Sequence, residues 1–162
     1  MSTQTWDVSS ENGFMARYRA TLPDVFRYAA MLCGSDRSLA EDVVQDVYLG
    51  ALSTTHDGRI AELSVGYLIV AVRHRHLDRL RSADREGRRL RLVASSPAAA
   101  DAFVPSLLSS VPERERTALV LRYVDDLAVA QVGREMGLST HAAESLLARA
   151  TRRLRNQEVR DA

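Results

Sequence analysis

Acidic and amide side chains gather on one face of a helical stretch, residues 38–52, whose sequence is SLAEDVVQDVYLGAL. The apolar residues of this stretch repeat at helical spacing and form the opposite face, as in an amphipathic helix that packs on a core. Carboxylates one turn apart can pair with a basic partner, although an acidic helix face is more commonly just solvated. The residues that could make such contacts are Glu41, Asp42, Gln45 and Asp46, with Leu49 as the apolar exception among them.

A second group of side chains, within residues 73–91, is rich in arginine and is opposed by only a few carboxylates. A basic patch of this kind is the electrostatic footprint of a protein that binds a nucleic-acid backbone, although a solvated arginine-rich helix would have the same pattern. His74 and His76 also lie here, but two residues apart on a helix they point about 200° away from each other. We therefore expect no metal site.

A third group lies near the C-terminal end, where two helical patterns flank a turn that contains glycine. The first pattern, residues 127–136, ends at Gly137, and Ser139 can cap the second, residues 140–154. This spacing is typical of a helix-turn-helix, whose second helix enters the major groove of DNA, although similar helical hairpins occur in proteins that never bind DNA. The side chains expected to face inward are Ala130, Gly133, Met136, Leu138, Ala143, Leu147, Ala150 and Leu154.

Composition excludes several classes of protein. The chain has 162 residues, 46% of them hydrophobic, a net charge of +1 and one cysteine, Cys33, which fits a reducing cytoplasm. It shows no signal-peptide pattern and no apolar stretch long enough to span a membrane. It also lacks a phosphate-binding glycine loop, metal-ligand spacing and a G-x-S-x-G nucleophile motif. We therefore expect no catalytic residue, no metal and no cofactor.

Helices and loops account for the whole pattern, so the expected fold class is all-α, with two small helical domains joined by a flexible linker. The domains are expected at residues 14–92 and 106–157, and the helix-turn-helix lies in the second. The linker is expected at residues 93–105, which are rich in Ala, Ser and Pro. Residues 1–13 are expected to form a disordered tail.

Local signals set the expected ends of the helices in the first domain. Pro23 should kink or split the first helix, and Gly34 should end it. Ser38 has the spacing of a capping box with the glutamate three residues later, so the second helix should begin there. The polar residues 53–62 are expected to form a surface loop. Residues 67–72 are apolar on all sides and should be buried.

The order of these groups resembles that of a bacterial sigma factor of the extracytoplasmic-function type, a compact class that keeps only the two promoter-reading domains. The resemblance spans residues 14–155. Residues 40–48, AEDVVQDVY, are similar to the most recognisable motif of the family, on the helix that docks against the coiled coil of the polymerase beta-prime subunit. The loop at residues 53–62, which in the family helps to capture a flipped base, has no clear match, so we assign no residue in it.

The remaining matches follow in the order of the family. Tyr67-Leu68, Arg73 and residues 78–81 resemble the helix that melts and reads the minus-10 promoter element. Residues 112–116, PERER, and 121–123, LRY, together with the helix-turn-helix, resemble the domain that binds the minus-35 element.

The resemblance implies a non-enzymatic protein that directs core RNA polymerase to promoters and assists their opening, in the cytoplasm and on the nucleoid when bound to polymerase. The implied partners are core polymerase, through its beta-prime clamp coiled coil and beta flap, and promoter DNA; anti-sigma factors are also common in the family. The implied core-polymerase contacts are Glu41, Asp42, Gln45, Asp46 and Leu49. The implied minus-10 contacts are Arg73, His74, Arg75, Arg79, Arg81 and Arg85. The implied minus-35 contacts are Thr140, His141, Glu144, Ser145, Arg149, Arg152 and Arg153, with Arg155 near phosphates.

Departures from the family pattern concern the reading helices. His74 stands where the family usually has Asn, and Ala142, Glu144 and Leu146 stand where it more often has Thr, Lys or Arg, and Arg. A carboxylate at Glu144 would either repel phosphates or accept a hydrogen bond from the amino group of cytosine. The alternative function is a helix-turn-helix regulator that acts without polymerase, and the acidic helix face argues against it because such a regulator has no use for that surface.

Overall fold

The computed structural model describes residues 8, 10–34, 36–59, 62–87 and 106–161, and these ranges contain helices but no strand. The all-α fold class is thus confirmed, while the predicted linker, residues 93–105, lies outside the described residues. The elements are α1 (Glu11–Cys33), α2 (Arg37–His56), α3 (Val65–Gly87), α4 (Ser106–Ser109), α5 (Glu113–Leu119), the π-helical η1 (Val120–Val124), α6 (Val129–Met136) and α7 (Thr140–Asp161).

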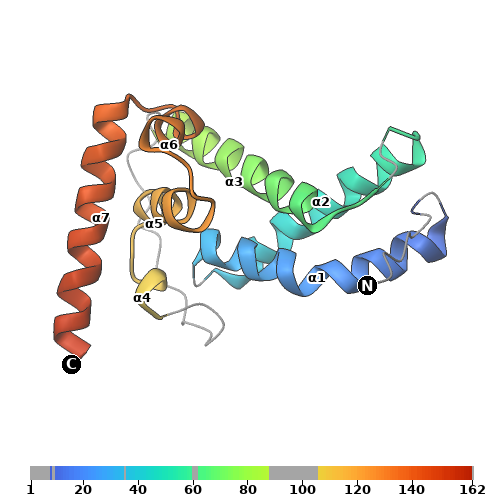
Figure 1. Ribbon diagram of the computed structural model, residues 1–162, viewed down its shortest axis with the longest axis horizontal. Coiled ribbons are helices and arrows are strands. Elements are labelled where there is room, and N and C mark those ends of the chain that lie inside the picture. The colour runs from blue at the N-terminus through green and yellow to red at the C-terminus, as the bar shows by residue number, and fades with distance from the viewer. Residues whose placement is uncertain (1–7, 9, 35, 60–61, 88–105, 162) are drawn as a thin grey trace.

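The first three helices pack on one another around a common core (Figure 1). Each contributes the apolar stripe that its spacing predicts, including Leu32 from α1, Val44 from α2 and Leu68 from α3. Cys33 lies in this core and behaves as a small buried residue, as expected, because burial raises the pKa of its thiol to about 11.

The C-terminal helices form a second core, in which α7 packs against α5 and α6. Leu119 and Leu121, at the junction of α5 and η1, pack with Val132 from α6 and Leu147 from α7. In Figure 1, α7 stands at one end of the molecule, far from the first turn of α1.

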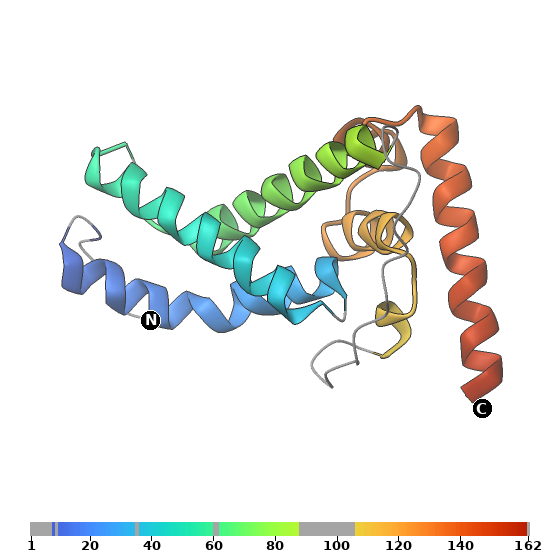
Figure 2. The same cartoon turned by 180° about the vertical axis from the view of Figure 1, so that it is seen from behind.

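The two halves share side chains across a continuous seam. Leu77 and Leu80, from the second half of α3, belong to the C-terminal core, whereas Val120 from η1 belongs to the N-terminal core. The last turns of α1 contact α5, and the end of α3 lies beside α6 (Figure 2). Helix α3 therefore runs through both cores as one continuous helix.

The first helix begins earlier than predicted and is not split. Ser10 caps it by accepting a hydrogen bond from the Gly13 amide at 3.1 Å, and Val8 is buried, so the tail predicted for residues 1–13 is wrong at its C-terminal end. The rest of that tail lies outside the described residues. Helix α1 continues through Pro23 to Cys33 and ends at Gly34 as predicted, with φ of 66°. Packing along its whole apolar stripe offsets the single backbone hydrogen bond that proline cannot donate.

The second helix is capped by Asp36 and not by Ser38. The Asp36 carboxylate accepts from the Leu39 amide at 2.9 Å, and Arg37 pairs with Glu41 across the added turn. Both Asp and Ser are good cap residues, so the sequence offers two starts and the earlier one gains an ion pair. The helix also continues to His56, which removes the first turn of the loop predicted for residues 53–62.

Two predictions of burial were wrong because each helix concerned packs on the core with only one face. Tyr67 and Val70 in α3 are 40% and 38% exposed, because α3 packs on α1 and α2 with only one face at this level. Ala130 in α6 is exposed, whereas Val132, about 200° further around the helix, is buried. An apolar residue type does not by itself define the direction of the core.

Candidate docking and nucleic-acid surfaces

The acidic face of α2 is open to solvent. All of its predicted contact residues are exposed, and the apolar Leu49 is 64% exposed. Asp46 accepts two hydrogen bonds from Arg75 of α3, at 2.9 and 2.5 Å, in a pair that is itself about half exposed. Such a surface ion pair adds little stability and can exchange partners. This surface, which we call the docking face, consists of Glu41, Asp42, Gln45, Asp46 and Leu49.

An apolar hollow of about 590 Å³ adjoins the docking face, and sequence reasoning missed it. It lies between the start of α1 and the end of α2, with Phe14, Met15, Leu49 and Leu52 among its lining residues. Three of its other lining residues, Val8, Ser10 and Glu11, were assigned to a tail, so no sequence pattern connected them to α2. The hollow extends the docking face with apolar surface.

The predicted minus-10 residues on α3 divide into two sets. His74 and Arg85 are exposed, Arg75 binds Asp46, and Arg81 bonds to Asp78 at 3.0 Å and to the backbone carbonyl of Glu135. The second set, which we call the covered pair, comprises Arg73 and Arg79. Both turn toward the C-terminal half, where Arg73 pairs with Asp125 at 3.2 Å and Arg79 with Glu113.

The helix-turn-helix has the geometry that its sequence predicts. Gly137 takes the left-handed conformation at φ of 67°, and Ser139 caps α7 by accepting from the Ala142 amide at 3.1 Å. Gly133 allows the close crossing of the two helices, because a Cβ there would lie 2.9 Å from the Leu138 carbonyl oxygen. Leu146, at a position where the family often has arginine, is only 6% exposed and belongs to the core, so it contacts no ligand in this arrangement.

The outward side chains of α7 are exposed as predicted: Thr140, His141, Glu144, Ser145, Arg149, Arg152 and Arg153. Arg153 donates to the Glu115 carboxylate at 2.9 Å, so it also ties α7 to α5. His141 lies 3.8 Å from Glu144.

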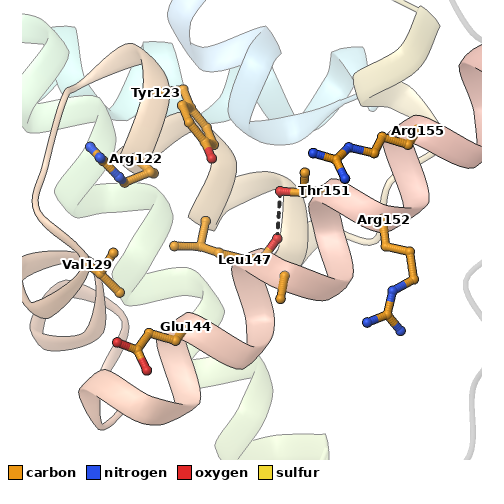
Figure 3. Close-up of a pocket in the computed structure, with 9 residues that line it drawn as sticks. Arg122, Tyr123, Val129, Glu144, Leu147, Thr151, Arg152 and Arg155 are labelled. Atoms are coloured by element: carbon orange, nitrogen blue, oxygen red, sulfur yellow. Dashed lines mark hydrogen bonds between the residues drawn. The ribbon is translucent and has the colours of Figure 1, made fainter.

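Beside these residues, an open hollow of about 470 Å³ lies between η1 and α7. Figure 3 shows the side chains that line it. Arg122 and Tyr123 approach it from η1, and Glu144, Arg152 and Arg155 from α7. Arg122 was not predicted as a site residue, because only the tertiary fold places it on the same hollow as Arg152. The hollow thus combines one carboxylate with several guanidinium groups, an arrangement that suits a phosphate backbone beside one base edge.

A buried polar cluster joins the two halves, and sequence reasoning missed it. His76 is fully buried, with Nε2 at 2.9 Å from the Thr117 hydroxyl and Nδ1 at 4.0 Å from Cys33 Sγ. The Thr117 hydroxyl donates to the Glu113 carbonyl, so the His76 Nε2–H is the donor in the first contact. Burial, together with the nearby Arg79 and Arg116, lowers the pKa of His76 to about 3. His76 is therefore a neutral structural residue.

Arg116 completes this cluster by hydrogen bonds to backbone carbonyls. Its Nε donates to Leu32 at 3.0 Å and its Nη1 to Val111 at 2.8 Å. Gly34 makes room for it, since a Cβ at Gly34 would overlap the guanidinium. Within the described ranges no group of His, Cys, Asp and Glu side chains could hold a metal ion, and none of the helices there is long and apolar enough to cross a membrane.

Comparison with known proteins identifies the family to which the chain belongs. Residues 17–86 match the family described as "Sigma-70 region 2", and residues 107–156 match "Sigma-70, region 4". The two matches follow the order of the two halves, and the chain belongs to the sigma-70 family. With region 4 following region 2 across one short connection, it is a member of the extracytoplasmic-function type.

Individual relatives agree with this assignment. The chain is 45% identical over 51 residues to RNA polymerase sigma factor SigF of Mycobacterium tuberculosis, in two strains, a match that covers 32% of this chain and 20% of that protein. The matched segment thus spans about a fifth of the length of these curated relatives. The fold is similar to that of the sigma factor RpoE of Bartonella quintana, solved in complex with the anti-sigma factor NepR, with a TM-score of 0.54 and 21% identity, over 88% of this chain and 94% of that one.

Proposed function

We propose that this protein directs core RNA polymerase to promoters with two recognition elements and assists strand opening. The observation that carries the proposal is the placement of three surfaces on one helical scaffold: the acidic docking face on α2, the arginines on α3 and the exposed helix α7. Membership of the sigma-70 family supports it. In this function the protein positions other molecules and catalyses no reaction itself.

The docking face is proposed to bind the clamp coiled coil of the beta-prime subunit. Glu41, Asp42 and Asp46 would pair with basic side chains and orient the encounter, while Leu49 and the apolar hollow beside it would supply buried area. Region 4 is proposed to contact the beta flap as well as DNA.

The DNA contacts are proposed on α3 and α7. On α3, Arg73, Arg75 and Arg79 would hold the opened minus-10 strand, with His74, Arg81 and Arg85 beside them. On α7, Thr140, His141, Glu144, Ser145 and Arg149 would face bases in the minus-35 major groove, with Arg152 and Arg153 near phosphates. Taking bases out of the stack costs a few kcal/mol, which binding to polymerase would offset.

Run-off transcription with purified core polymerase and fragmented genomic DNA tests the function. We expect discrete transcripts whose start sites share two sequence elements. Stable binding to core polymerase without any promoter-dependent transcript would contradict the proposal for initiation. The alternative, a regulator independent of polymerase, predicts tight and specific binding to duplex DNA by the chain alone.

The docking face is tested by reversing the charges of Glu41 and Asp46 to Arg. The double variant E41R/D46R should lose binding to core polymerase, with unchanged helical content by circular dichroism. The matched control is D24R, a reversal at an exposed carboxylate on α1 outside the docking face, which should bind like the wild type. Equal affinities of the two variants would show that the face is only solvated surface.

The location and the further partner are also proposals. Binding to polymerase places the protein in the cytoplasm, and on the nucleoid when it is engaged at promoters. RpoE of Bartonella quintana was solved with an anti-sigma factor. We propose that a partner of this kind covers the docking face, which a pull-down with wild-type chain and the E41R/D46R variant would test.

A further inference from the structure

The second half of helix α7 carries an exposed basic line that ends in an apolar residue. Arg152, Arg155 and Val159 are spaced by three and four residues, so they follow one another along one side of the helix. All three are exposed, and Val159, at 79%, is the most exposed large hydrophobic residue of the described ranges. Their neighbour Arg153 turns to Glu115 instead and helps to hold the fold. We call Arg152, Arg155 and Val159 the α7 stripe.

The docking face of α2 carries the same pattern with the opposite charge. Asp42 and Asp46 are one turn apart, and Leu49 follows three residues later. This line and the α7 stripe each extend over seven residue steps, which is about 10 Å along a helix. Leu49 is 64% exposed and borders the apolar hollow of about 590 Å³. Two anions followed by an apolar side chain therefore have the same length as two cations followed by an apolar side chain.

The two lines match when α2 and α7 lie side by side and run in the same direction. Each carboxylate of α2 then faces one guanidinium of α7, and Val159 lies against Leu49 at the edge of the apolar hollow. A guanidinium suits this contact because its donors form two parallel hydrogen bonds with a carboxylate. The opposite direction would place an apolar side chain against a charge at both ends, so the pattern also selects the orientation.

The α7 stripe cannot reach the docking face of its own molecule. Helix α7 stands at one end of the molecule, and the last turn of α2 lies at the other end, beside the start of α1 (Figures 1 and 2). A contact between the two surfaces must therefore join two molecules. The net charge of +1 leaves little long-range repulsion between copies of the chain.

We propose that the chain associates with itself head to tail, with the α7 stripe of one copy bound to the docking face of the next. The contact joins two different surfaces, so each assembly keeps one free docking face and one free stripe at its ends and grows with concentration. The inference rests on the proposed function for one consequence only. Core polymerase and DNA would use the same two surfaces and would therefore disperse the assemblies.

The test reverses each surface separately in the purified full chain. The variant D42R/D46R makes the docking face basic, and the variant R152D/R155D makes the α7 stripe acidic. Sedimentation equilibrium over a wide range of concentrations gives the weight-average mass of the wild type, of each variant and of an equal mixture of the two variants. Circular dichroism checks that each variant is folded.

Matched controls reverse the same number of exposed charges outside both surfaces. The variant D24R/E86R is the control for the docking face, and R19D/R134D is the control for the α7 stripe. Both should associate like the wild type, which separates the effect of these positions from the effect of a changed net charge.

We expect the wild-type mass to rise above that of a monomer as the concentration increases. Each reversal variant alone should lose more than about tenfold in association constant, because like charges then face each other. The mixture should recover the association, since the basic docking face of one variant meets the acidic stripe of the other. Raising the salt from about 0.1 to about 1 M should weaken wild-type association, because the Debye length falls from about 10 to about 3 Å.

A further variant, V159D, keeps the test decisive if a reversal variant does not fold. Val159 is 79% exposed, so its replacement leaves the core intact, and a carboxylate there would face Leu49 and the apolar hollow. The association constant of V159D should therefore be lower than that of the wild type.

Several results would overturn the proposal. A wild-type chain that stays monomeric at every concentration would do so, and so would reversal variants that associate like the wild type. A mixture of the two variants that stays monomeric would show that the surfaces do not contact each other, and association that strengthens with salt would assign it to apolar surface alone. Failure of the proposed function is recognised separately, by chain that associates as expected but gives no promoter-dependent transcript with core polymerase.

Discussion

The docking face of α2 and the arginines of α3 carry opposite charges and differ in how far they are open to solvent. The docking face is exposed along its whole length, and its contact with Arg75 is a solvated surface pair. The covered pair on α3 is held against the C-terminal half by Asp125 and Glu113. The comparison teaches that the proposed polymerase-binding surface is open to solvent, whereas part of the proposed strand-binding surface is held against the C-terminal half.

The largest expected effect on stability comes from a substitution at Gly34. This glycine leaves room for Arg116 at the seam between the two halves. G34A would place an L-residue at φ of 66° and push the Arg116 guanidinium off the Leu32 carbonyl. We expect a loss of about 2–4 kcal/mol in the free energy of unfolding, measured by urea denaturation. The control is G50A, at an open helical site, which should be neutral or slightly stabilising. Equal stabilities of the two variants would mean that Arg116 is not held as described.

The second prediction is that protonation of His76 at low pH weakens the seam. The pKa of His76 is lowered from 6.5 to about 3, mainly by burial and further by Arg79 and Arg116. The folded chain therefore binds fewer protons than the unfolded chain between these values, so the contribution is complete above pH 6.5 and falls as the pH drops. The slope should be about 1.4 kcal/mol per pH unit.

Two histidine variants isolate this effect. In urea denaturation between pH 6.5 and about 5, where most carboxylates stay ionised, H76Q should flatten the pH dependence. H74Q, which changes an exposed histidine on the same helix, should leave the slope unchanged. A slope that survives in H76Q would assign the titration to another group.

A smaller effect is expected at Glu144, on a surface that is exposed like the docking face. E144A should relax base preference at one position of the minus-35 element by about 1–3 kcal/mol if the carboxylate accepts from cytosine. Sequencing of selected promoter variants, bound by holoenzyme, measures the preference. A uniform rise in affinity for all sequences would instead show that Glu144 only repels phosphates.

The smallest effect is expected for the pair that links the two surfaces. R75A removes the ion pair with Asp46, which is about half exposed, and should change the free energy of unfolding by less than about 1 kcal/mol. The same variant should leave the radius of gyration unchanged, because the pair lies within one half of the molecule. A marked increase in the radius of gyration of R75A would show that this ion pair, and not the contacts with the C-terminal half, holds the two halves together.

Local features of the fold could be predicted from the sequence because they depend on residues close in the chain. Gly34, Gly137 and Ser139 end or cap helices where their chemistry predicts. The start of α2 was missed because Asp36 and Ser38 are both competent caps, and only packing chooses between them.

The seam could not be predicted, because its contacts join residues far apart in the chain. Nothing in the spacing of Tyr28 relates it to Asp125, and His76 is an ordinary histidine until Thr117 and Arg116 close over it. The amphipathic pattern also placed α3 in one core, whereas its second half belongs to the other. The sequence indicated that the arginines of α3 suit DNA, but it did not predict that Arg73 and Arg79 pair with carboxylates of the C-terminal half.

The position of Leu77 and Leu80 has a consequence for handling the protein. Both lie on α3 in the C-terminal core, so opening the seam uncovers apolar surface together with the arginines. An opened chain without a partner would be prone to self-association, since contiguous exposed apolar patches favour aggregation. Dilute solutions of this protein should therefore stay monodisperse only while the two halves remain packed together.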